Sequence, residues 1–64
     1  MKVGDMIHTP RFLKVRIAAV YEGKNAEQDA RRDGYTEPTH YKGDYQILGK
    51  VTEPNHMVFA AVKE

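Results

Sequence analysis

Apolar and polar side chains alternate most clearly between Phe12 and Tyr21, where the sequence reads FLKVRIAAVY. Apolar residues recur at every second position, and Lys14 and Arg16 occupy positions between them. A side-chain period of two is typical of a strand with one buried face. We therefore expect a long strand over residues 12–21, ended by the polar residues and the glycine at 22–24.

Two further alternating segments, 45–52 and 56–62, flank a turn sequence at 53–55 that contains Pro54 and Asn55. Proline and asparagine both favour turns, so these segments predict a hairpin. The second segment is apolar on both sides, because Met57, Phe59 and Ala61 alternate with Val58, Ala60 and Val62. Such a strand is usually central in a sheet, or is covered on its second face by a partner.

Between these strands the sequence predicts one short helix. Asn25 suits the N-cap, and Gln28 stands at the third helical position, which gives a capping-box pattern. Gly34 is placed for a left-handed C-terminal cap, after which Tyr35 can fold back over Ala30. The small apolar face of this helix predicts close packing against a sheet.

Together these elements predict an α+β fold, with one domain over residues 1–64. We expect a three- or four-stranded antiparallel sheet with one short helix, in the order (β)-β-α-β-β. The bracketed strand is the segment 2–8, which the pattern leaves open between an edge strand and a turn. The alternative is a small SH3-like β-barrel that begins with this segment. The expected core is Leu13, Val15, Ile17, Ala19, Ala26, Ala30, Ile47, Val51, Met57, Phe59 and Ala61.

The residue types present exclude several chemistries. The 64 residues include no cysteine and no serine, which removes disulfides, thiolate metal sites and the two commonest nucleophiles. The five glycines are scattered and form no phosphate-binding loop. The three histidines, His8, His40 and His56, have no spacing that preorganises a zinc site. We therefore expect neither an enzyme nor a bound cofactor or metal.

The remaining function is binding, and the first candidate partner is another protein or a second copy of the chain in a homodimer. Tyrosine is a preferred interface residue, and an irregular segment at 34–44 concentrates it. The exposed second face of the last strand would extend this surface. The partner-binding residues expected are Tyr35, Pro38, His40, Tyr41, Tyr45, Val58, Ala60 and Val62.

The alternative is a nucleic-acid-binding module on the basic face of the first long strand. Basic and aromatic side chains on an open sheet can neutralise phosphates and stack on bases. The residues of this face are Arg11, Phe12, Lys14, Arg16 and Lys50. A formal net charge of +1 gives no strong overall attraction to nucleic acid or to an anionic membrane. The apolar runs are too short to cross a bilayer, and we expect a cytoplasmic protein.

Three segments carry a resemblance to a known family: GYTEPTHY at 34–41, YQILGK at 45–50 and MVFAAV at 57–62. Through them most of the chain resembles a family of very small, uncharacterised proteins encoded in phages and conjugative elements of Gram-positive bacteria. The resemblance implies no activity, cofactor or site residue. It implies a setting, since mobile elements carry many small proteins that bind host or defence proteins, or DNA.

Overall fold

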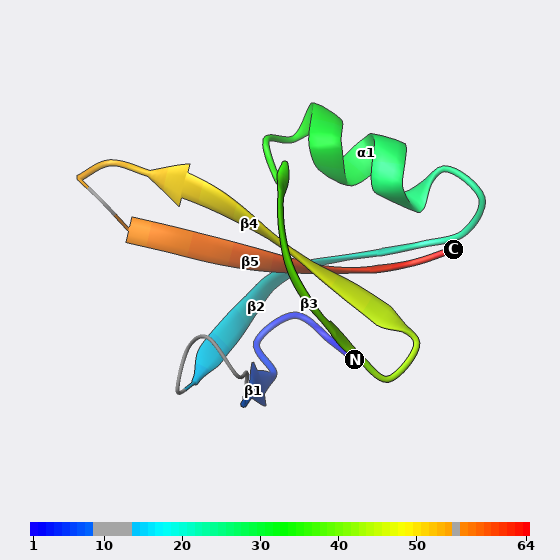
Figure 1. Cartoon of the computed structure of the whole chain (residues 1–64), viewed down its shortest axis with the longest axis horizontal. Helices are drawn as coiled ribbons and strands as arrows, with labels where there is room; N and C mark the ends of the chain where they lie inside the picture. The colour runs from blue at the N-terminus through cyan, green and yellow to red at the C-terminus, as the bar shows by residue number, and fades with distance from the viewer. Residues whose placement is uncertain (9–13, 55) are drawn as a thin grey trace.

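The computed structural model describes residues 1–8, 14–54 and 56–64, and within them the chain forms five strands and one helix (Figure 1). In chain order the elements are β1 (Met6–Ile7), β2 (Val15–Glu22), α1 (Ala26–Arg32), β3 (Glu37–Lys42), β4 (Tyr45–Thr52) and β5 (His56–Lys63). The strands form one sheet in the order β1-β2-β5-β4-β3. Neighbouring strands are antiparallel except β2 and β5, which are parallel.

The predicted three- or four-stranded antiparallel sheet is therefore wrong, and so is the SH3-like alternative. The sheet is mixed, has five strands and curls into a half-barrel. One reason is β3, which forms where an irregular segment was expected. Its polar residues and Pro38 suit an edge strand but give no alternating pattern. The other is the long connection through α1, β3 and β4, which returns β5 parallel to β2.

Strand β2 changes its buried face halfway along its length. Val15 and Ile17 are buried on one face, as the alternation predicts. The register with β5 shifts between Ile17 and Ala19. Beyond this bulge Val20 packs against the core that contains Ile17, whereas Ala19 and Tyr21 pack against the core on the helix side. One extra residue in a strand turns the following side chains to the opposite face. The expectation that the apolar residues at every second position of 12–21 share one face is thus wrong beyond Ile17.

Two hydrophobic cores lie on opposite faces of the sheet and share β5. On the side away from α1 the buried residues are Ile7, Val15, Ile17, Ile47, Phe59 and Ala61. On the helix side they are Ala26, Ala30, Tyr35, Leu48, Ala60 and Val62. The last strand is therefore apolar on both faces because it is central in the sheet, and it needs no partner to cover its second face. Leu13, an expected core residue, lies outside the described residues.

The burial of β5 overturns the argument for a contact on its second face. Ala60 is fully buried and Val62 is 3% exposed, because α1 and Tyr35 cover them within one chain. Val58 is only partly buried on the same side. Ala60 and Val62 are thus not available to a partner, and the case for a homodimer through them disappears. Val51, which was expected in the core, is 66% exposed.

The C-terminal end of α1 forms as predicted. Gly34 has a positive φ of 103°, and its N–H donates to the carbonyl of Arg31 while that of Tyr35 donates to the carbonyl of Ala30. These two bonds define a Schellman motif. The predicted capping box does not form, because Asn25 makes no side-chain cap hydrogen bond. No helix in the described part of the chain has the length and apolar character that crossing a membrane requires.

Candidate functional site

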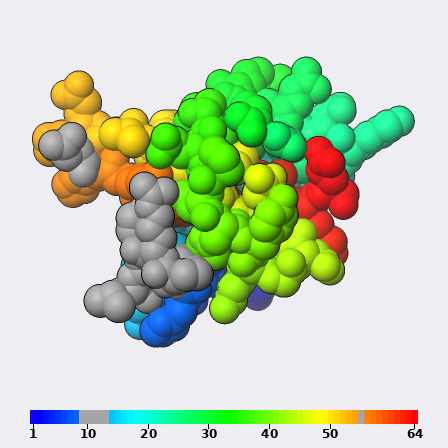
Figure 2. Space-filling view, viewed as in Figure 1, coloured from blue at the N-terminus to red at the C-terminus, as the bar shows by residue number. Residues whose placement is uncertain are grey.

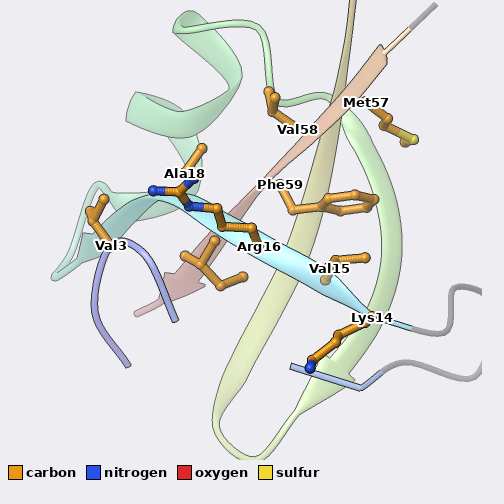
Figure 3. Close-up of a pocket in the computed structure, with 9 residues that line it drawn as sticks. Val3, Lys14, Val15, Arg16, Ala18, Met57, Val58 and Phe59 are labelled. Carbon is orange, nitrogen blue, oxygen red and sulfur yellow. The ribbon is translucent and has the colours of Figure 1, made fainter. Parts of the chain in front are cut away.

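A concave surface lies where β2 and β5 diverge. Their parallel pairing begins at Ile17 and Phe59. Before this point β2 pairs with β1 through Val15 and Arg16, while the start of β5 pairs with β4. The wedge between the two strands is an open groove of about 560 Å³ (Figure 3). This volume lies within the usual range of small-ligand sites.

The same divergence leaves the end of the β4–β5 hairpin projecting from the sheet. Strand β3 pairs with β4 only as far as Gly49, and β2 pairs with β5 only from Phe59 onward. Residues 50–52 and 56–58, which we call the hairpin tip, extend past both neighbouring strands of the described pairing. The space-filling view shows this tip standing out from the body of the molecule (Figure 2). Its projection explains the exposure of Val51.

Among the described residues, the groove combines an apolar surface with two cations. Apolar side chains from three segments supply most of the described lining: Val3, Val15, Ile17, Ala18, Met57, Val58 and Phe59. Lys14 and Arg16, both exposed, supply the charge, and no described acidic residue lines the groove. Figure 3 shows the Phe59 ring in the wedge near Val15, and the Arg16 side chain running along β2 toward Ala18. Neither Lys14 nor Arg16 makes an ion pair with a described residue.

Two of the tyrosines expected at an interface are engaged inside the chain. Tyr35 is 7% exposed and meets the Tyr21 ring edge-on, with ring centroids 6.0 Å apart. The Tyr21 hydroxyl donates to Asp33 Oδ2 at 2.6 Å. Tyr45 is half-buried, and its hydroxyl donates to Glu22 Oε2. Tyr35 and Tyr45 therefore tie the helix side and the strand ends together.

The pKa of each of Tyr21, Tyr35 and Tyr45 is raised, and burial contributes to the rise in all three. For Tyr21, burial is the largest cause, and the hydrogen bond to Asp33 adds to it. For Tyr35, burial again leads and the charge of Asp33 follows. For Tyr45, the hydrogen bond to Glu22 is the main cause of the higher pKa. In all three the protonated form is thus favoured.

The other predicted partner residues lie on the edge strand β3, away from the groove. Pro38 is exposed and Tyr41 is 72% exposed. β3 is separated from β2 by β4 and β5. The structure therefore does not bring Tyr41 and Val58 into one surface. Of the predicted protein-binding set, Val58 alone lines the groove within the described residues.

His40 on β3 is held in one tautomer. The Thr39 hydroxyl donates its proton to the carbonyl of Ile47 at 2.9 Å, so His40 Nδ1, 3.0 Å away, must act as the donor to that hydroxyl. His40 Nε2 is then an acceptor, and it is buried with no hydrogen-bond partner among the described residues. Burial, followed by the charge of Lys42, lowers the pKa of His40. These contacts anchor the bulge in β3 rather than form a ligand site.

The predicted basic face is only partly assembled. Lys14 and Arg16 both line the groove. Lys50 is instead held on the helix side, where its Nζ donates to the carbonyl of Asp33 at 3.1 Å and lies 5.2 Å from the centre of the Tyr35 ring. Arg11 and Phe12 lie outside the described residues. Within the described residues, no group of three or more histidines and acids could hold a metal ion.

Comparison with models of known protein families, with curated proteins and with solved structures gives no match. The resemblance to small proteins of mobile elements therefore stays a prediction. The sequence did not point to Val3, Val15, Met57 and Phe59 as groove residues, because they form one surface only when β2 and β5 lie side by side. The one available signal was the mixture of basic and apolar positions in the first long strand.

Proposed function

We propose that this chain is a non-catalytic binding protein that holds a segment of another protein in the groove between β2 and β5. One observation carries the proposal: an open apolar groove has Lys14 and Arg16 on its surface and no described acid to neutralise them. Apolar area supplies affinity, and unpaired charges at the rim supply specificity and orientation. The resemblance to proteins of mobile elements supports a host or defence protein in the cytoplasm as partner.

Nucleic acid is the weaker candidate. Its expected surface needed five residues, and of the three that are described Lys50 already contacts Asp33 and Tyr35. The described lining offers two cations on an otherwise apolar surface, which gives few phosphate contacts, and phosphate contacts supply most of the affinity in sequence-independent binding. The groove suits an apolar peptide better than a polyanion.

The test is a selection of random displayed peptides on the purified protein, followed by mapping of the enriched peptides by NMR. We expect chemical-shift changes to concentrate at residues 14–18 and 57–59, and binding to weaken in the double variant Lys14→Glu, Arg16→Glu. Both substituted residues are exposed, so the variant should fold. The matched control is Lys24→Glu with Lys42→Glu, two exposed cations that do not line the groove.

Each double variant changes the formal net charge from +1 by −4, to −3, so overall charge is the same in both. Equal weakening by the two variants would contradict a groove-specific contact. Enriched peptides whose shift changes fall on β3 would move the binding surface there and refute the proposal. Selection of no peptide above background would also count against it.

A further inference from the structure

The groove has features that restrict the conformation of its ligand. On the β2 side, the first three residues of β5 have no strand partner in the described pairing, because the β2–β5 ladder begins at Phe59. On the other side these residues are fixed by pairing with β4. A strand edge that is rigid on one side and open on the other is the surface to which extended peptides add. Here that edge forms one wall of the groove.

The charges of the groove restrict the composition of the ligand. Lys14 and Arg16 both line the groove, and Figure 3 shows their charged ends apart from each other, at two places on its margin. The described lining contains no carboxylate. A ligand with one or two carboxylates would complement this margin, whereas a basic ligand would be repelled.

The apolar wall restricts the ligand further. Met57 and Val58 are both partly buried at the start of β5, and they face opposite sides of the strand, because Met57 packs against the core of Ile17 and Val58 against that of Ala60. An apolar side chain placed against either of them would remove its remaining surface from water, which favours binding roughly in proportion to the area covered. Successive side chains of an extended peptide point to opposite sides, so its apolar and acidic residues can meet different walls.

We propose that the ligand is an extended acidic–apolar peptide segment that lies beside residues 56–58 of β5 and directs its carboxylates to Lys14 and Arg16. This inference rests on the proposed function and names the chemistry of the partner. The bound segment is thus an acidic strand of another protein rather than a helix or a polyanion.

The probe is a synthetic peptide in which glutamate alternates with leucine, measured by fluorescence anisotropy against the intact protein. Its first control replaces every glutamate by glutamine, and its second places proline at the centre, because proline cannot continue a strand ladder. A third probe is single-stranded oligothymidylate. We expect the glutamate peptide to bind about fivefold or more tightly than the glutamine peptide, which corresponds to rim charge pairs of about 1 kcal/mol. We also expect affinity to fall with salt.

On the protein side, Lys14→Gln with Arg16→Gln should remove the preference for glutamate without unfolding the chain, since both residues are exposed. Equal binding of the glutamate and glutamine peptides would overturn the inference and leave the groove proposal intact. Equal binding of the proline peptide would overturn the extended geometry. Tight binding of oligothymidylate with no peptide bound would overturn both the inference and the proposed function.

Discussion

Replacement of Gly34 by alanine tests the contact that joins α1 to the sheet. Gly34 has φ of +103°, and a Cβ placed there would lie 3.0 Å from Lys50 Cδ. A side chain in left-handed backbone conformation costs about 1–2 kcal/mol. The displacement of Lys50 adds to this, because a side chain forced off its rotamer costs about 0.5–1.5 kcal/mol. We expect a total loss of about 2–3 kcal/mol.

Such a loss is a large share of the stability of this chain. At about 0.05–0.15 kcal/mol per residue, 64 residues give roughly 3–10 kcal/mol for the free energy of unfolding. Urea unfolding followed by far-UV circular dichroism measures the change directly. With an m-value of about 1 kcal/mol per molar urea, the midpoint should fall by about 2–3 M. Tyrosine fluorescence gives a second probe, since the chain has no tryptophan.

Gly23 provides the matched control. Its φ is +116°, but a Cβ there would meet nothing within 4 Å. Gly23→Ala should therefore show the backbone term alone, about 1–2 kcal/mol. In the Lys50→Ala background, Gly34→Ala should lower the free energy of unfolding by correspondingly less, because the side chain that the new Cβ would contact is absent. A Gly34→Ala midpoint equal to that of the wild type would refute the reasoning, and equal losses at Gly34 and Gly23 would refute the Lys50 contribution.

Three further outcomes are expected. Tyr21→Phe should lower the free energy of unfolding by about 1 kcal/mol at neutral pH, because the hydrogen bond to Asp33 is lost. Since the pKa of Tyr21 is raised in the folded protein, this contribution to wild-type stability is fully present below the ordinary pKa of 10 and is lost as pH rises above it. Urea midpoints measured against pH should therefore fall less steeply above pH 10 in the variant than in the wild type. Because the pKa of His40 is lowered in the folded protein, wild-type stability should fall as pH drops below 6.5. In His40→Gln the urea midpoint should depend less on pH in this acidic range. Ile17→Ala should cost about 2–5 kcal/mol, whereas Val51→Ala, 66% exposed, should stay within about 0.5 kcal/mol; equal urea midpoints for these two would contradict the assigned core.

Local patterns in the sequence predicted the features that depend on near neighbours. The Gly34 cap with Tyr35 folded back, and the hairpin of β4 and β5, are determined by residues within a few positions of each other. The alternation in β2 predicted the burial of Val15 and Ile17 correctly. It failed beyond Ile17 because a bulge depends on the neighbouring strand, and no residue type in AAV marks one.

The features that were missed depend on distant pairing. β3 forms because β4 offers it a partner, although its own residues, with Pro38 and Thr39 among them, have little strand character. The parallel pairing of β2 with β5 joins Ile17 to Phe59, and the groove arises from where that pairing begins. The sequence therefore predicted only part of the candidate site. Its described cations, Lys14 and Arg16, could be named, but the apolar residues of the groove could not.

The position of β5 also has a consequence for how quickly the molecule can assemble. β3, β4 and β5 follow one another through short turns, so they can pair early with little loss of chain entropy. Residues 17 and 59 are 42 positions apart, and their meeting closes the largest loop between paired strands. Contacts of such separation slow folding. We expect β2 docking to be the late step, so that mutations in the β4–β5 hairpin alter the folding rate and those in β1 mainly alter the unfolding rate.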